Sequence, residues 1–301
     1  MKISIIISVF NEESVLPLFY KEITAVLNTR DYELIFVNDG STDGSQSILD
    51  KFSADNKRVK TILFSRNFGH EAAMIAGIDL ANGDAVICMD ADLQHPPAAI
   101  EQMLECFQNQ KADVIMMIRD NAKKSVFSSL FYKLLNTVSE YRFEPNASDF
   151  FLISRVVAEL LRNNYRERVR FLRGFIQIIG FRKISLTYTA NARSAGKSKY
   201  STDKLISLSV TAIATLSKMP LKISIYAGVL SGAFSVLLTI YSIVMKIIQQ
   251  PISGYTTIVV FLGVMFSILF LILGVLGQYI GFLFDEQKAR PIYIIDKTTN
   301  I

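Results

Sequence analysis

The sequence predicts an α/β protein in which a doubly wound sheet is followed by a two-helix transmembrane hairpin. Short apolar or β-branched runs alternate with helical stretches four times in about the first hundred residues, which is typical of a mostly parallel sheet. Two uncharged runs, residues 223–245 and 256–284, are each long enough to cross a bilayer at about 1.5 Å per residue. The mean hydropathy of +0.32 reflects these runs, because the apolar excess lies after residue 222.

The elements of the first part are bounded by turn residues, prolines and helix-capping side chains. We expect strands at residues 2–10, 32–37, 59–64, 85–89 and 113–118, and helices at residues 15–27, 46–54, 71–81 and 97–108. A further apolar strand is expected directly after Asp149. Residues 125–138 repeat apolar side chains at helical spacing, which favours a core-packing helix over a helix on a membrane surface.

Composition narrows the class of partner. The formal charge is only +5 over 301 residues, and the basic residues crowd the region before the first apolar run. This distribution favours an anionic lipid surface or a phosphate substrate over nucleic acid. Cys88 and Cys106 are the only cysteines, so a disulfide scaffold or a zinc site is not expected.

Asp90 and Asp92 follow a continuous apolar strand that reads as a buried, central one. The carboxyl end of such a strand is where open α/β sheets bind their ligands. Two carboxylates at this spacing suit Mg²⁺ or Mn²⁺, which also takes substrate phosphates as ligands. An isolated Asp-x-Asp is more often a solvated turn, so the surrounding chain has to decide between the two interpretations.

Two basic segments precede the hairpin. Residues 162–173 hold five arginines, which fits either a solvated helix face or contact with phosphates. Residues 191–200 form a basic, flexible stretch around Gly196 that could wrap a phosphate. Residues 203–216 are amphipathic, so an interfacial helix is expected over residues 201–222.

The charges around the apolar runs predict their orientation. Lys and Arg before the first run and after the second outnumber the single Lys246 between them, so both ends should face the cytoplasm. The expected organisation is a cytoplasmic catalytic domain, an interfacial helix, a multi-pass hairpin in the inner (cytoplasmic) membrane and a cytoplasmic tail. Their bounds are residues 1–200, 201–222, 223–284 and 285–301.

Five polar motifs follow one another along the chain: SVFNEE (8–13), VNDGSTD (37–43), RNFG (66–69), DADLQ (90–94) and RSAGKSKY (193–200). In this order and spacing the chain resembles the family 2 glycosyltransferases of the GT-A fold. Within them it is most similar to the polyprenyl-phosphate glycosyltransferases, which include dolichyl-phosphate mannose synthases and bactoprenol glucosyltransferases. The resemblance extends over essentially the whole chain, including the hairpin and the closing RPIY (290–293).

The resemblance implies a role for each matching residue. The nucleotide sugar would be bound by Val9, Asn11, Glu12, Asp39, Asp90 and Ala91, with Asp39 holding the base. Asp90, Asp92 and Gln94 would hold Mg²⁺ or Mn²⁺, with Asp92 nearest the diphosphate. Phosphates of donor or acceptor would be bound by Arg119, Arg193, Lys197 and Lys199. Asp149 would match the catalytic base and, with Asp92, form the catalytic pair.

The resemblance also implies the reaction, an inverting transfer of a sugar from a nucleotide-sugar donor to polyprenyl phosphate at the cytoplasmic membrane face. UDP-glucose and undecaprenyl phosphate are the favoured substrates, the product would serve cell-envelope glycosylation, and a homo-oligomer is possible. His95 stands where glucosyl enzymes often have Asp and mannosyl enzymes often have His, so a GDP-mannose donor stays open.

The chemistry of the acceptor modifies the expected role of Asp149. A phosphomonoester has a second pKa of about 6 and is largely dianionic at pH 7. We therefore expect Asp149 mainly to orient the acceptor, taking a proton only from the monoanionic fraction.

Two other functions compete with this interpretation. Processive polysaccharide synthases share the first four motifs, but they resemble one another further in a tryptophan-containing motif that binds the growing chain. This chain has no tryptophan, and its two apolar runs are too few to build a sugar-conducting pore. A membrane-tethered protein that binds nucleotide sugar without transferring it is the other alternative. Loss of Asp92 or Asp149 would favour it, and both are present.

Overall fold

The computed structural model describes residues 1–121, 133, 136–137, 143–144, 147–167, 171–191, 219–248 and 254–301. The chain forms two compact units. One comprises residues 1–133, 141–202 and 290–301, and the other residues 134–140 and 203–289. The helix expected over residues 125–138 lies almost entirely outside the described residues.

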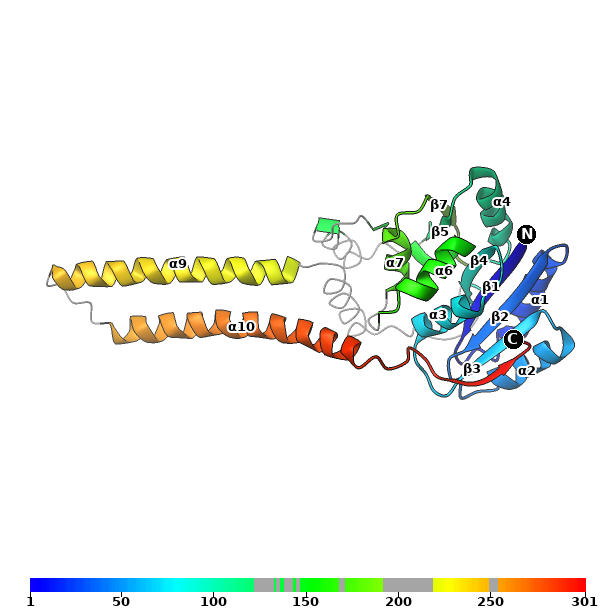
Figure 1. Cartoon of the computed structure of the whole chain (residues 1–301), viewed down its shortest axis with the longest axis horizontal. Coiled ribbons are helices and arrows are strands. Elements are labelled where there is room, and N and C mark those ends of the chain that lie inside the picture. Colours follow the sequence, from blue (N-terminus) through cyan, green and yellow to red (C-terminus); the bar gives the residue numbers. More distant parts are fainter. Residues whose placement is uncertain are drawn as a thin grey trace. The chain divides into compact units, whose positions relative to one another are not determined.

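The first unit is built on one sheet (Figure 1). Its strand order is β7-β5-β6-β4-β1-β2-β3-β8. The strands are β1 (Lys2–Val9), β2 (Asp31–Asn38), β3 (Val59–Phe64), β4 (Ala85–Asp90), β5 (Val114–Arg119), β6 (Ala147–Ser154), β7 (Lys183–Tyr188) and β8 (Ile295–Thr299). The first four run parallel to one another, as the alternation of strands and helices predicted. β6 and β8 are the antiparallel members of an otherwise parallel sheet.

β6 lies between β4 and β5 and is antiparallel to both. Ser154, at its carboxyl end, pairs with Ala85 at the amino end of β4, and Phe151 pairs with Cys88. The amino end of β6, which carries Asp149, therefore lies beside the carboxyl end of β4. The sequence indicated the strand but not this position in the sheet.

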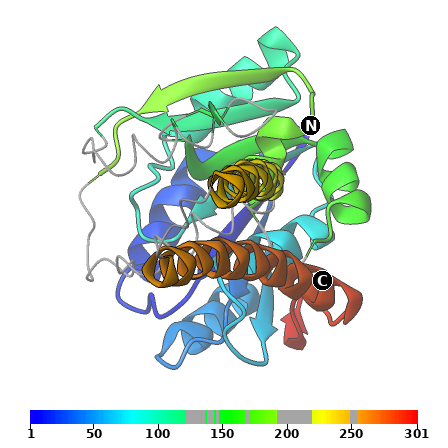
Figure 2. The same cartoon turned by 90° about the vertical axis from the view of Figure 1, so that its left-hand side faces the viewer.

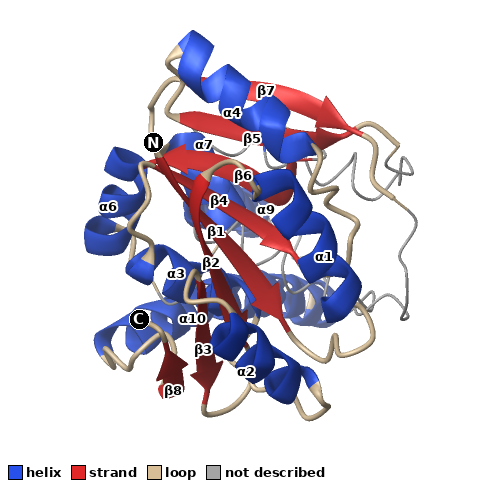
Figure 3. Cartoon of the chain, turned by 90° about the vertical axis from the view of Figure 1, so that its right-hand side faces the viewer, coloured by secondary structure: helices blue, strands red, loops and turns tan. Residues whose placement is uncertain are grey.

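Helices cover both faces of the sheet (Figure 3). One core is covered by α1 (Leu16–Leu27), α2 (Ser45–Asp55) and α4 (Ala99–Gln110), and the other by α3 (His70–Leu80), α6 (Arg155–Asn164) and α7 (Leu172–Ile178). Alternation along β1 supplies both cores, since Ile5 and Ile7 pack in the first and Ile6 in the second. The doubly wound α/β fold is thus confirmed.

The carboxyl-terminal segment returns to the sheet as β8, antiparallel to β3. Tyr293 precedes it and stacks on Phe64, with ring centroids 5.2 Å apart. The Tyr293 hydroxyl donates to Asp79 Oδ2 over 2.6 Å, and Arg166 forms an ion pair with the same carboxylate. Residues 290–301 therefore belong to the first unit, whereas the sequence had indicated only a tail.

The second unit contains α9 (Met219–Ile247) and α10 (Tyr255–Gln287), which run side by side (Figures 1 and 2). Phe234 and Phe261 contact each other across the pair, with ring centroids 6.3 Å apart. Residues 219–245 and 260–287 are long and apolar enough to cross a membrane, and most of their side chains are exposed. These are the two helices that the uncharged runs predicted, each extended beyond the expected ends. Of the interfacial helix expected over residues 201–222, only residues 219–222 are described, and they belong to α9.

Gly77 allows α3 to approach β1 closely. A Cβ atom at this position would lie 2.1 Å from Ile6 Cγ2. Gly77→Ala should therefore lower the free energy of unfolding by about 1–3 kcal/mol, the usual range for overpacking. The shift in the unfolding midpoint of the purified chain measures this.

Ile6→Ala provides the matched background, because it removes the methyl group that the new Cβ would meet. The cost of Gly77→Ala should be smaller in Ile6→Ala than in the parent. An equal cost in both backgrounds would show that the contact with Ile6 is not what requires glycine.

Candidate active site

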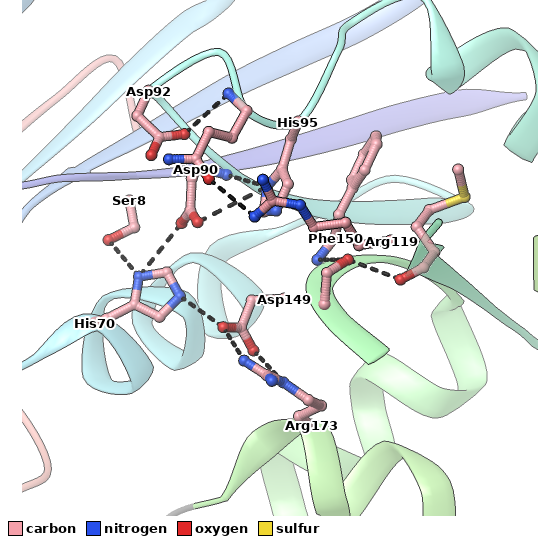
Figure 4. A network of polar contacts seen from close by, with 12 residues as sticks. Ser8, His70, Asp90, Asp92, His95, Arg119, Asp149, Phe150 and Arg173 are labelled. Atoms are coloured by element: carbon pink, nitrogen blue, oxygen red, sulfur yellow. Dashed lines mark hydrogen bonds and ion pairs between the residues drawn. The ribbon is translucent and has the colours of Figure 1, made fainter. Parts of the chain in front are cut away.

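Polar side chains gather at one edge of the sheet, where β1, β2, β4 and β5 end and β6 begins. The described members are Ser8, Asp39, Asp90, Asp92, Gln94, Arg119 and Asp149, with His70 and Arg173 on α3 and α7. Figure 4 shows all of these except Asp39 and Gln94 with labels. Open α/β sheets bind ligands at the carboxyl ends of their strands, so this edge is the candidate active site.

The pleat of the strands decides which of these side chains meet. Val86 and Cys88 pack in the core beneath α3, and alternation places Asp90 on the same face of β4. Phe151 packs in that core as well, which places Asp149 on the same face of β6. The two carboxylates therefore lie on the side of the sheet that α3 and α7 cover.

His70, the first residue of α3, joins three strands (Figure 4). Its Nδ1 lies 3.1 Å from Ser8 Oγ and 3.5 Å from Asp90 Oδ1, while its Nε2 lies 3.8 Å from Asp149 Oδ2. Burial lowers the pKa of His70, but the charges of Asp90 and Asp149 outweigh burial and raise it. Sequence reasoning missed this residue, although it directly follows the RNFG motif.

Arg173, near the start of α7, pairs with both carboxylate oxygens of Asp149. Its Nε donates to Oδ1 over 3.0 Å, and Nη2 donates to Oδ2 over 2.5 Å. Burial raises the pKa of Asp149, but the charges of Arg173 and His70 outweigh burial and bring it to about 2. Asp149 is thus a carboxylate with little tendency to accept a proton, which argues against the expected proton transfer from the monoanionic acceptor. The sequence marked the arginine-rich segment but not this arginine.

Hydrogen bonds fix Asp92 and Gln94 in the Asp-x-Asp loop. The Gln94 backbone N–H donates to Asp92 Oδ1 over 3.1 Å, and Arg119 Nη1 donates to Gln94 Oε1 over 3.3 Å. Leu93 has a φ of 61°, so the loop turns sharply between them. The structure therefore links Asp92, Gln94 and Arg119 by hydrogen bonds, and their roles in binding metal or phosphate stay predictions.

The donor atoms of this loop fit an open site for a hard cation. Within the described ranges, no three or more His, Cys, Asp or Glu side chains are arranged to enclose a metal. Asp90, Asp92 and Gln94 nevertheless offer carboxylate and amide oxygens, which Mg²⁺ and Mn²⁺ prefer. These ions keep several positions for water or phosphate oxygens, so a partial set of protein ligands suits them.

His95 connects the loop to β6. The Asp90 backbone N–H donates to His95 Nδ1 over 3.0 Å. The same nitrogen lies 3.8 Å from Asp90 Oδ2. The ring stacks on Phe150, with centroids 5.1 Å apart, next to Asp149 in the chain.

The residues predicted to bind the nucleotide lie where β1 and β2 end. Asp39 is 2 % exposed and accepts the backbone N–H groups of Phe68 and Gly69 over 2.6 and 3.0 Å. Burial raises the pKa of Asp39, and these two hydrogen bonds oppose the shift. Asn11 Oδ1 accepts the Thr42 N–H over 2.8 Å and so ties the two loops together.

The other predicted nucleotide-binding residues lie at the carboxyl ends of β1 and β4. Val9 and Ala91 are buried, and the Val9 carbonyl accepts the Asp39 N–H over 2.9 Å. The Glu12 N–H donates to Ser45 Oγ over 3.0 Å. Arg193, Lys197 and Lys199 lie outside the described residues, so their roles stay predictions.

Comparison with known proteins identifies the family. The pattern of the glycosyl transferase family 2 domain matches residues 4–169. The chain belongs to glycosyl transferase family 2. It is therefore a glycosyltransferase, and its sheet is of the GT-A type that the motifs implied.

Relatives of this family 2 glycosyltransferase match it over nearly its whole length. It is 37% identical to the uncharacterized glycosyltransferase YkcC of Bacillus subtilis (strain 168), covering 99% of this chain and 94% of that one. It is 36% identical to the SfII prophage-derived bactoprenol glucosyl transferase of Shigella flexneri, covering 99% and 98%.

Solved structures show the same fold at low identity. Glucosyl-3-phosphoglycerate synthase of Mycobacterium tuberculosis, in complex with Mn²⁺, UDP-glucose and phosphoglyceric acid, matches with a TM-score of 0.51 and 16% identity, covering 71% of this chain and 78% of that one. Mannosyl-3-phosphoglycerate synthase of Rubrobacter xylanophilus matches with a TM-score of 0.50 and 14% identity, covering 71% and 73%.

Asp92→Asn tests the Asp-x-Asp loop, because it removes a charge while keeping the shape of the side chain. We expect the rate of sugar transfer to fall by about 10²-fold or more, as for a lost electrostatic contact to the transition state. Asp55→Asn, at the exposed end of α2, makes the same charge change away from the site and should leave the rate unchanged. A near-parental rate for Asp92→Asn at saturating Mn²⁺ would show that the charge of Asp92 does not contribute to transfer and that the loop has only a structural role.

Proposed function

We propose that this enzyme transfers glucose from UDP-glucose to undecaprenyl phosphate at the cytoplasmic face of the inner membrane. Full-length relatives named bactoprenol glucosyl transferase, or a homolog of it, support glucose as the sugar and a polyprenyl phosphate as the acceptor. The structural observation that carries the proposal is the Asp149–Arg173 pair, which occupies both oxygens of the carboxylate expected to act on the acceptor.

The state of Asp149 favours an acceptor that is already ionised. A hydroxyl acceptor needs a general base whose pKa lies near the working pH. Asp149, with a pKa of about 2, is a poor base for that task. A phosphomonoester, whose second pKa is about 6, supplies a nucleophilic oxygen without help. A phosphomonoester is therefore the acceptor class that this site suits, and the bactoprenol named for relatives makes a lipid phosphate the proposed acceptor.

The donor would bind with its base near Asp39 and its diphosphate near the Asp-x-Asp loop. Asp90, Asp92 and Gln94 would hold Mg²⁺ or Mn²⁺, which when bound neutralises the charge of the leaving diphosphate. Arg119, beside Gln94, adds a cation to that side of the site. A phosphate oxygen of the lipid would bond to the anomeric carbon as the bond to UDP breaks. One in-line displacement on an α-linked donor gives a β-linked product.

The path of the chain supports a hairpin that enters and leaves the membrane on one side. β8 follows α10 and pairs with β3 in the sheet that also contains β1. Both flanks of the α9–α10 hairpin therefore return to the catalytic unit, in keeping with the excess of Lys and Arg outside it. The hairpin would hold the enzyme at the depth of the lipid headgroups, where Arg193, Lys197 and Lys199 could reach phosphates.

A transfer assay tests the proposed function. The purified full chain would be given UDP-glucose or GDP-mannose, farnesyl or undecaprenyl phosphate, and Mg²⁺, Mn²⁺ or EDTA. We expect a metal-dependent glycolipid from UDP-glucose with both acceptors. Preference for GDP-mannose would reassign the donor. Nucleotide binding without a glycolipid from any pair would favour the tethered binding protein.

The pH dependence of Asp149→Asn tests the role of the carboxylate. Because the pKa of Asp149 is about 2, it stays charged from about pH 5.5 to 8.5, so only the acceptor titrates there. Parent and variant rates should both rise as pH increases through about 6, with a constant ratio between them. A ratio that narrows toward high pH would show that Asp149 takes a proton from the monoanionic acceptor.

Replacing residues 219–289 by a flexible Gly/Ser linker tests the hairpin while keeping β8. Transfer to undecaprenyl phosphate in vesicles should fall by about 10-fold or more, because enzyme and lipid no longer share a surface. Transfer to micromolar farnesyl phosphate in solution should change much less. Equal losses with both acceptors would mean that the hairpin supports the fold itself.

A further inference from the structure

We propose that Arg173 contacts the substrate: its guanidinium, held in place by Asp149, binds the phosphate of the lipid acceptor. This inference rests on the proposed function and adds an acceptor-binding residue on α7. The geometry that carries it is the pair of hydrogen bonds from Arg173 to Asp149, the carboxylate expected to face the acceptor (Figure 4).

Arg173 is positioned before any ligand arrives. The Leu172 backbone N–H donates to Glu71 Oε2 over 2.6 Å, which fixes the start of α7 against α3. Gln177 Nε2 donates to the Arg173 carbonyl over 3.1 Å one turn later. With its backbone held by these bonds and its side chain held by Asp149, the guanidinium needs no rearrangement to receive an anion.

The charges at this place require a cation if a phosphate is to approach. Asp149 and Glu71 are both acidic, and burial together with the charge of Asp149 raises the pKa of Glu71. A dianionic phosphate next to Asp149 alone would meet repulsion. Arg173 offsets the charge of Asp149 and supplies the attraction, and its side chain is 27% exposed and so remains accessible.

The shape of the guanidinium suits two anions at once. It is planar and has five N–H donors, of which the Asp149 carboxylate accepts from Nε and one Nη. Paired N–H groups match phosphate oxygens as well as carboxylate oxygens. Asp149 would thus act on the acceptor through Arg173. The opposing interpretation is that Arg173 only orients Asp149. The two interpretations predict different rates of UDP release from UDP-glucose in the absence of acceptor.

The experiment compares Arg173→Gln and Arg173→Lys with the parent in the full chain, and Arg182→Gln serves as control. Arg182 is exposed at the amino end of β7, so its substitution makes the same charge change at the opposite end of the sheet. Three quantities are measured: the KM for farnesyl phosphate, the release of UDP from UDP-glucose without acceptor, and the Kd of farnesyl phosphate in the presence of UDP and Mn²⁺.

For Arg173→Gln we expect the KM and Kd of farnesyl phosphate to rise by about 10-fold or more, the usual loss for a hydrogen bond to a charged group. Acceptor-independent UDP release and the KM for UDP-glucose should stay within about twofold of the parent. Arg173→Lys should recover part of the affinity, because it keeps the charge but not the fork. Arg182→Gln should match the parent throughout.

Two results would overturn the inference. An unchanged Kd for farnesyl phosphate in Arg173→Gln would show that the guanidinium does not contact the phosphate. A fall in UDP release equal to the fall in transfer would show that Arg173 acts only through Asp149. If the parent binds farnesyl phosphate through Arg173 but makes no glycolipid, the proposed function fails and this contact stands. If the parent does not bind it at all, both fail.

Discussion

The antiparallel insertion of β6 between β4 and β5 is the constraint on which the site depends. Because β6 runs opposite to its neighbours, its first residues meet the last residues of β4, and Asp149 and Asp90 lie on the same face of the sheet. A parallel strand in this place would bring Ser154 to the edge instead. The pairing thus sets the carboxylates of Asp90 and Asp149 against one surface, that of α3.

Residues at the start of α3 hold the ends of β4 and β6 and the start of α7 in place. Gly77 lets the helix lie close to β1, so that His70, at its first position, reaches both strands. The next residue, Glu71, holds the start of α7 and with it Arg173. The backbone just before the helix donates to Asp39. One helix terminus therefore sets the spacing between Asp39, Asp90 and Asp149.

Local patterns in the sequence explain what could be predicted. The strands β1 to β4, the Asp-x-Asp loop at the end of β4 and the two apolar helices follow from runs of neighbouring residues. The position of β6 and the pairing of β8 with β3 depend on contacts between distant parts of the chain, which single-sequence patterns do not specify. The pairing of Arg173 with Asp149 could not be predicted for a related reason. Nothing in a run of arginines indicates which one has a partner 24 residues away.

A carboxylate already paired with arginine, beside a loop suited to a diphosphate, supports one displacement by a pre-ionised acceptor. The anomeric configuration of the product tests this most directly. Proton NMR of the glycolipid made from UDP-α-glucose and farnesyl phosphate should show a β-linked sugar. An α-linked product would require a second displacement or attack from the leaving-group side, and would contradict the mechanism.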